Sequence, residues 1–288
     1  MRFRFVEDHR EVFPVRVMCS VLRVSASGYY AWRSRPESAR ATANRALVED
    51  IRRVHASSRR RYGSPRVHAS LRTEGKQVGR NRVARLMRRH GIQAHRRRQF
   101  RKTTDSDHAF PPAPNLLARQ FASAVAPNQV WLADMTYIAT GEGWLYLAVV
   151  LDLFSRRVVG WAMSETMPQE LTLAALRMAI TNRRPGPGLL HHSDRGSQFA
   201  AHDYRRVLDA HGMRCSMSRN GDCWDNAPIE SFFGSLKTEL DGDGPFETRQ
   251  AAHTALFGFI EGFYNRQRLH SAIGYITPVN KEDLAAAA

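Results

Sequence analysis

The sequence predicts an α/β domain preceded by an all-helical, strongly basic region. From Gln129 onward, runs of β-branched and aromatic residues alternate with segments whose apolar residues recur at helical spacing. Before residue 103, helical spacing dominates. Residues 1–107 hold 27 Lys and Arg against 9 Asp and Glu, whereas residues 108–288 hold 16 against 18. Two regions that differ in pattern and charge within 288 residues predict two domains.

Composition excludes several classes of protein. The sequence has no run of 18 apolar residues and no signal-peptide pattern, so we expect a cytoplasmic protein without a membrane partner. Its three cysteines, Cys19, Cys215 and Cys223, are widely spaced and form no CxxC pair. Neither a disulfide framework nor a zinc site is therefore expected.

The basic front region is predicted to bind nucleic acid, because clustered Lys and Arg neutralise phosphates. Two short helices are expected within residues 5–34 and another helix over residues 42–56. Tyr29, Tyr30 and Trp32 fall on the second short helix. They fit either a DNA-binding helical module or a simple packing core, and the sequence leaves both interpretations open.

A helix-turn-helix is predicted at about residues 60–95. Ser64-Pro65 is expected to cap its first helix, and residues 75–79 to form the turn. The second helix is expected over residues 80–90, ended by Gly91, with one apolar face. The candidate DNA-contacting residues on its other faces are Arg82, Arg85, Arg88 and Arg89.

The two regions are expected to be joined by a linker over residues 103–128. Pro111, Pro112 and Pro114 cannot lie inside a regular element. A basic connector, Arg96-Arg97-Arg98 with Arg101-Lys102, precedes it. The predicted division is thus 1–102 basic helical region, 103–128 linker, 129–245 α/β core and 246–288 C-terminal helix and tail.

Strands and helices alternate in the predicted core. Strands are expected at 130–138, 144–152, 157–164 and 213–216, with another ending at Asp194. Helices are expected at 169–182, 200–211 and from Ala227 onward. A last helix is expected over 247–268, followed by an extended segment, HSAIGYITP, that closes the chain.

Three acids stand out in this core. Asp134 lies within a predicted strand, Asp194 at the end of another, and Glu230 in the first turn of the helix that begins at Ala227. Thirty-five residues separate Asp194 from Glu230, and Lys237 lies two helical turns after Glu230 on the same face. Carboxylate oxygens suit hard cations, so this set predicts a site for two Mg²⁺ ions, or Mn²⁺ in their place.

This pattern resembles the acid triad of DDE transposases and retroviral integrases. The phrases WLADMTYI, LDLFSRRVVGW, HHSDRGSQF, DNAPIESFFGSLKTE and YNRQRLHSAIGYITP are similar, in this order, to the second reading frame (OrfB) of bacterial insertion sequences. The resemblance covers nearly the whole chain. It implies a ribonuclease H-like, integrase-type fold for the α/β domain.

The resemblance further implies a transposase that cleaves DNA strands and joins a 3′-hydroxyl to target DNA. Asp134 would be the bridging metal ligand, with Asp194 on one ion and Glu230 on the other, and Lys237 would face DNA. Expected partners are element ends and target DNA, the protein of the upstream reading frame or a fusion with it, and further copies of this chain. The alternatives are a DNA-binding regulator with an inactive domain and a structure-specific nuclease.

Other polar residues near the acids receive structural interpretations. Asp152 is predicted to form an ion pair with Arg156 or Arg157. Asp222 and Asp225 are interpreted as loop and cap residues, and Trp224 and Asn226 as residues that shape the loop before Glu230. His191 and His192 should point to opposite faces of their strand, which favours roles in the core. Tyr264, Arg268 and neighbouring residues could suggest a tyrosine recombinase, but they lie too close together in the sequence for that chemistry.

Overall fold

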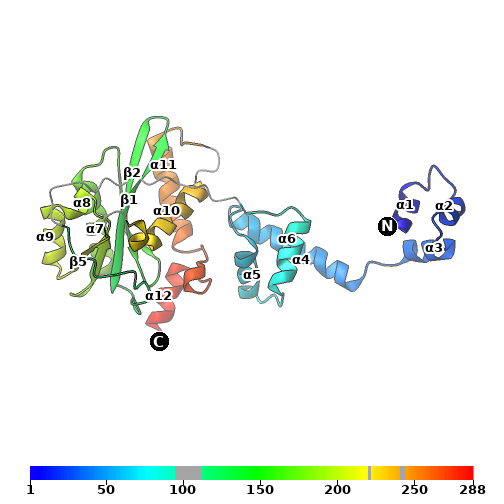
Figure 1. Ribbon diagram of the computed structural model, residues 1–288, viewed down its shortest axis with the longest axis horizontal. Coiled ribbons are helices and arrows are strands. Elements are labelled where there is room, and N and C mark those ends of the chain that lie inside the picture. Colours follow the sequence, from blue (N-terminus) through cyan, green and yellow to red (C-terminus); the bar gives the residue numbers. More distant parts are fainter. Residues whose placement is uncertain (95–111, 220–221, 241–243, 288) are drawn as a thin grey trace. The chain divides into compact units, whose positions relative to one another are not determined.

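A computed structural model describes residues 1–94, 112–219, 222–240 and 244–287 (Figure 1). These residues form two units, Met1–Arg53 and Val54–Ala288. Helix α4 (Ala39–Ser57) contains the division between them. The predicted basic connector and the Pro111 end of the proline cluster lie outside the described residues.

The first unit contains three short helices rather than the two predicted: α1 (Arg2–Asp8), α2 (Val15–Val21) and α3 (Ala26–Ser34). Their core includes Tyr29, whose hydroxyl donates a hydrogen bond to Glu7 at 2.5 Å. Tyr30 and Trp32 are exposed on α3. The packing interpretation is therefore right for Tyr29.

The helix-turn-helix has the predicted elements, α5 (Ser64–Thr73) and α6 (Arg80–Arg89). Apolar side chains from both helices are buried, among them Val67 on α5 and Val83 on α6. The N-cap of α5 is Gly63 and no side chain caps it, so the predicted cap at Ser64 is wrong. Gly75 begins the turn at φ 81°, a conformation that glycine adopts without strain.

A five-stranded mixed sheet forms the centre of the second unit, in the order β3-β2-β1-β4-β5. β1 (Val130–Thr140), β2 (Gly143–Asp152) and β3 (Val158–Ser164) are antiparallel neighbours. β4 (Leu190–Ser193) runs parallel to β1, and β5 (Arg214–Met217) parallel to β4. The predicted α/β class and strand order along the chain are confirmed.

Helices cover both faces of this sheet (Figure 1). α7 (Gln169–Arg183), α8 (Ser197–Ala200) and α9 (His202–Ala210) lie on one face, and α10 (Ala227–Leu240) and α11 (Arg249–Phe257) on the other. The predicted helix over 200–211 corresponds to α9, and the short helix α8 before it, separated by the extended Ala201, was not predicted. Trp131, Leu176 and Tyr204 belong to the buried core between the sheet and α7–α9.

The C-terminal part departs most from prediction. After Phe257 the helix continues as a π-helix over Gly258–Tyr264, and a 3₁₀ turn follows at Ser271–Ile273. The chain then forms α12 (Pro278–Ala286), so the predicted extended ending is wrong. Thr277 caps α12 by accepting the Asn280 N–H, and Pro278 occupies the first helical position, which together favour a helix start.

The helix-turn-helix is joined to the C-terminal segment by hydrogen bonds. The Leu269 N–H donates to the Tyr62 hydroxyl at 2.7 Å, and Arg66 Nε donates to the Leu269 carbonyl at 2.9 Å. Arg61 donates to the Glu239 carbonyl at the end of α10 at 3.1 Å. In the described parts of the chain, no helix is long and apolar enough to cross a membrane.

Candidate active site

Two of the three acids come directly after the last paired residues of two neighbouring strands, β1 and β4. Parallel pairing of β1 with β4 ends at Ala133 and Ser193, and the next residues are Asp134 and Asp194. Neighbouring strands lie about 4.8 Å apart. Both carboxylates therefore stand where the two strands stop pairing, and both side chains are partly buried.

The third acid comes from α10, which packs against β1. Asn226, directly before the helix, donates from Nδ2 to the Ala133 carbonyl at 3.3 Å. This bond ties the start of the helix to the residue before Asp134. Glu230 lies in the first turn and is exposed. The three acids predicted from the sequence thus lie in one region of the fold.

Electrostatics support this convergence. Burial raises the pKa of Asp134 well above its usual range, and the negative charges of Asp194 and Glu230 raise it further. The Met135 N–H, which donates to Asp134 at 2.7 Å, and the Lys237 ammonium oppose this rise. Lys237 Nζ also lies 4.9 Å from the centre of the Tyr137 ring. The region therefore concentrates negative charge that a bound cation would stabilise.

The donor set has the chemistry of a hard-cation site. Its ligands are carboxylate oxygens, which Mg²⁺ and Mn²⁺ prefer. As the described side chains stand, no three acids, histidines or cysteines are close enough together to hold an ion. Asp194 accepts the Gly196 N–H at 2.9 Å, which restrains one carboxylate at the end of β4. The residue types fit divalent metal, whereas the number of ions is not fixed by this arrangement.

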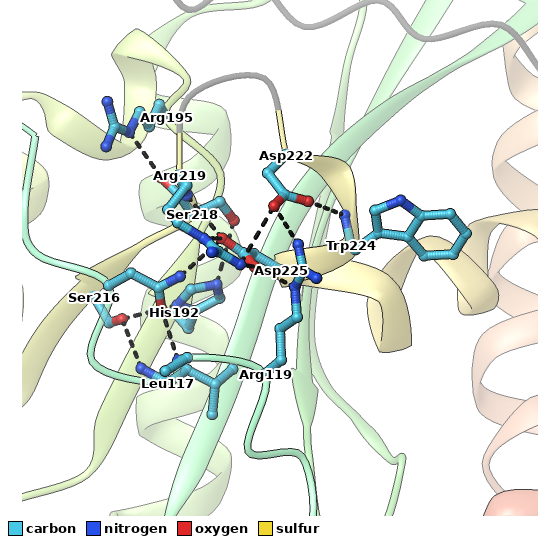
Figure 2. A network of polar contacts seen from close by, with 12 residues as sticks. Leu117, Arg119, His192, Arg195, Ser216, Ser218, Arg219, Asp222, Trp224 and Asp225 are labelled. Atoms are coloured by element: carbon cyan, nitrogen blue, oxygen red, sulfur yellow. Dashed lines mark hydrogen bonds and ion pairs between the residues drawn. The ribbon is translucent and has the colours of Figure 1, made fainter.

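A network of ion pairs holds the loop that leads to Glu230 (Figure 2). Asp225 is fully buried and accepts hydrogen bonds from Arg119 Nε at 2.7 Å, Asn115 Nδ2 at 2.8 Å and the Arg219 guanidinium at 2.8 Å. The Arg219 hydrogen bond, followed by further bonds from Arg219 and Arg119, holds the pKa of Asp225 well below its usual range despite burial. Asp222 caps the short turn before α10 by accepting the Trp224 N–H. Both acids are loop and cap residues, as predicted.

The same network reaches the loop that carries Asp194. Arg195 Nε donates to the Ser218 carbonyl at 2.7 Å (Figure 2). His192 Nδ1 lies 2.8 Å from Ser216 Oγ, and His191 Nε2 lies 3.0 Å from the Tyr204 hydroxyl on the other side of the strand. Burial lowers the pKa of His191 to about 3 and that of His192 to about 4. Both histidines are therefore neutral core residues at pH 7, as predicted.

One predicted ion pair is wrong. Asp152 is buried and accepts backbone N–H bonds from Asn128 at 2.7 Å and Ser155 at 2.9 Å. Arg157 instead pairs with Glu282 of α12, at 2.6 Å. The prediction failed because α12, which supplies the acid, was not expected.

The tyrosine-recombinase interpretation also finds no support. Tyr264 is buried and its pKa is raised by burial, so its hydroxyl is neither accessible nor easily ionised. Arg268 pairs with Glu239 at 3.0 Å. These residues pack the domain.

Sequence reasoning missed the contribution of Arg119 and Asn115. Both lie in the predicted linker, although residues 112–119 pack along β5, where Leu116 N–H donates to Ser216 Oγ at 2.9 Å. The sequence feature that could have indicated this packing is the apolar pair Leu116-Leu117 between Asn115 and Arg119. The predicted DNA-contacting residues Arg85, Arg88 and Arg89 are exposed on α6, and Arg82 is half-buried.

Comparison with known proteins gives matches along most of the chain. Two family models of an integrase core domain match residues 124–223 and residues 211–278. A family model of an HTH-like domain matches residues 42–100. An uncharacterized 31 kDa protein of insertion element IS600 from Shigella sonnei is 48% identical over 261 residues, covering 91% of this chain and 96% of that protein. Transposase InsF for insertion sequence IS3A from Escherichia coli (strain K12) is 40% identical over 285 residues, covering 98% and 99%.

Retroviral integrases are among the solved structures with some likeness to this chain. The catalytic core domain of HTLV-2 integrase in complex with magnesium matches at 20% identity and a TM-score of 0.42, over 55% of this chain and 98% of that chain. A simian T-cell lymphotropic virus intasome matches at 16% identity and a TM-score of 0.47, over 81% and 74%. The family assignment depends on the close relatives, which this chain covers almost completely. The chain belongs to the DDE transposases of bacterial insertion sequences, enzymes with an integrase core domain and an HTH-like DNA-binding domain.

Proposed function

We propose that Asp134, Asp194 and Glu230 are the catalytic metal ligands with which this transposase cuts and joins DNA. Asp134 would bridge two divalent ions, Asp194 would bind one of them and Glu230 the other. Divalent ions held this way activate an attacking oxygen and stabilise a leaving oxygen. Mg²⁺ fits the all-oxygen donor set, and Mn²⁺ would replace it.

The observation that carries this proposal is that Asp134 and Asp194 directly follow the last paired residues of β1 and β4, while Asn226 ties the start of the Glu230 helix to the Ala133 carbonyl. The charges of Asp194 and Glu230 accordingly add to burial in raising the pKa of Asp134. Acids with strongly perturbed pKa values, gathered from separate elements, favour a functional site over chance. The partial exposure of the two aspartates and the exposure of Glu230 allow a DNA phosphate to approach.

The protein groups around the acids have complementary tasks. The strand ends hold the two aspartates, and Asn226 with the Asp225 network fixes the start of the helix that presents Glu230. Lys237 would contact DNA from the same helix face. In the joining step, a DNA 3′-oxygen forms a bond to a target phosphorus, and the bond to the target's own 3′-oxygen breaks.

The proposal extends to organisation and partners. The chain would be divided into a basic helical region (1–102), a linker (103–128), a catalytic core (129–245) and a C-terminal helix and tail (246–288). The arginines of α6 would contact element ends or target DNA: Arg82, Arg85, Arg88 and Arg89. Further copies of the chain would bind together on DNA, and the upstream-frame protein or a fusion with it would supply end recognition. The bacterial relatives support action in the cytoplasm, where element DNA lies.

A strand-transfer assay tests the proposal. The full chain, alone and fused to the upstream frame, would receive Mg²⁺ or Mn²⁺ and an element-end duplex with a recessed 3′-hydroxyl. Joined product should fall at least about 100-fold in Glu230→Gln, because several kcal/mol of charge stabilisation disappear. Glu261→Gln is the matched control, since Glu261 accepts a bond from Trp161 away from the three acids.

Cleavage without joining would favour a nuclease. DNA binding with no product from the wild-type fusion would favour a regulator with an inactive domain. Equal product from wild type and Glu230→Gln would remove Glu230 from the site.

A further inference from the structure

A cavity of about 290 Å³ lies along one side of α10. Ser231 and Ser235 line it. Because successive helical residues are rotated by about 100°, Ser231 lies about 100° and Ser235 about 140° around the helix from Glu230, so the cavity is on another side of α10 than Glu230. The other walls come from α5, the loop between β2 and β3, and the C-terminal segment around residues 264–272.

The cavity is lined by three arginines: Arg66 from α5, Arg156 from the β2–β3 loop and Arg268 from the C-terminal segment. None of the described residues that line it is acidic. Arg268 pairs with Glu239, which neutralises one of the three charges. Two guanidinium charges therefore remain in excess around one space.

Two residues that line the cavity each have a buried nitrogen with no hydrogen-bond partner among the described residues: Arg156 Nε and His270 Nε2. His270 Nδ1 lies 3.5 Å from Arg268 Nη1, which can only donate. Burial and the neighbouring charges of Arg268 and Arg66 lower the pKa of His270 to about 2. The imidazole is therefore neutral at pH 7, although a hydrogen bond with the Tyr264 backbone opposes the lowering of its pKa.

The start of α10, at Ala227 and Pro228, lines the same cavity and adds the positive end of a 14-residue helix. Charge, the unpaired Arg156 Nε and helix orientation all favour an anion with several acceptor oxygens.

We propose that this cavity binds a phosphate group of the DNA backbone, on another side of α10 than Glu230. Arginine guanidinium groups pair with phosphate oxygens in a two-pronged geometry, and the Ser231 hydroxyl would complete the shell. The choice of DNA as the source of the phosphate rests on the proposed strand-joining function. A phosphate held here would fix the path of a DNA strand that passes α10.

The test measures DNA binding by the full chain without metal, so that it is independent of catalysis. Fluorescence anisotropy with an element-end duplex at several salt concentrations gives the Kd and its salt slope. Arg156→Gln should raise the Kd on the order of tenfold and reduce the slope by about one, because one phosphate contact is lost. Arg156→Lys keeps the charge and should keep the slope.

Arg177→Gln is the matched control, since Arg177 is exposed on α7 and its loss changes the net charge equally. Melting temperatures show whether each variant is folded. If Arg156→Gln unfolds, Ser231→Ala replaces it and should weaken binding without changing the melting temperature. A Ser231→Ala chain that binds as wild type would then overturn the proposal.

Inorganic phosphate distinguishes the source of the ligand. If it raises the melting temperature of wild type but Arg156→Gln binds DNA unchanged, the cavity takes a small anion and the DNA proposal is wrong. Identical behaviour of Arg156→Gln and wild type in both measurements would overturn the site altogether. Failure of the proposed function would instead appear as absent joining by wild type in metal, whatever the binding result.

Discussion

Asp134→Asn should make the protein more stable while it abolishes strand joining. Asp134 is a partly buried acid whose pKa is raised by burial and by Asp194 and Glu230. Two unit charges about 4.8 Å apart, the spacing of neighbouring strands, repel by about 3.5 kcal/mol at an effective dielectric constant near 20. Solvent exposure reduces the net effect to about 1–2 kcal/mol. For a unit of this size, the melting temperature should rise by about 2–8 °C in EDTA at pH 7.

The sign of the pH dependence follows from the raised pKa. Wild type carries the charge penalty above the pKa of Asp134 in the folded state and loses it as the carboxyl becomes protonated. The stability advantage of Asp134→Asn should therefore shrink as the pH falls and vanish below the pKa of an unfolded aspartate, about 3.9. Thermal unfolding followed by circular dichroism across this pH range measures it.

Divalent metal should reverse the order of stabilities. Binding to the folded state alone stabilises wild type by about 1.4 kcal/mol at ten times the Kd, and Asp134→Asn should gain much less. Asp152→Asn is the matched control, because Asp152 accepts bonds from Asn128, Ser155 N–H and Ser155 Oγ. In Asp152→Asn the side-chain NH₂ group would point toward one of these donors, which should lower the free energy of unfolding by about 1–3 kcal/mol. A lower melting temperature for Asp134→Asn in EDTA would refute this reasoning.

Three further predictions concern the loop network, the core and the basic helix. Asp225→Asn should lower the free energy of unfolding by about 1–3 kcal/mol at pH 7. Because the pKa of Asp225 is lowered in the folded state, wild type should lose this stability advantage as the pH falls below about 4. Equal acid unfolding curves for the two proteins would contradict the role of the network. Gly160→Ala should lower stability by about 1–3 kcal/mol because the new Cβ would lie 2.2 Å from the Ala175 carbonyl, whereas Gly186→Ala, with open space around it, should be nearly neutral in the same thermal unfolding experiment. Arg85→Gln and Arg88→Gln should each reduce the salt slope of DNA binding by about one, and an unchanged slope would place the DNA elsewhere.

The sequence predicted the sheet and its strand order along the chain because hydrophobic alternation is local. The strands near Asp134 and Asp194 are long or flanked by clear turns, and their pairing follows from burial of one apolar surface. The acids could be identified because their spacing resembles that of a known family. The spacing of the acids in the sequence could not predict that the parallel pairing of β1 with β4 ends directly before Asp134 and Asp194.

Long-range contacts account for what the sequence did not reveal. Glu282, on the unexpected helix α12, pairs with Arg157 and Arg183, which lie more than 90 residues earlier in the chain. Arg119 reaches Asp225 from a segment that composition indicated to be linker. Such ion pairs depend on tertiary placement and leave no periodic signal in the sequence. The start of α12, by contrast, was marked by Thr277 and Pro278 and could have been predicted.

Metal rescue of strand joining by Asp194→Cys tests most directly that the acids bind metal for catalysis. Thiolate is a softer ligand than carboxylate, so the cysteine variant should be inactive with Mg²⁺ and regain joining with the less hard Mn²⁺. Asp194→Ala should stay inactive with both ions, and wild type should be active with both. If Asp194→Cys joins DNA as well as wild type with Mg²⁺, or if Asp194→Ala recovers with Mn²⁺ as well as the cysteine variant does, Asp194 is not a catalytic metal ligand.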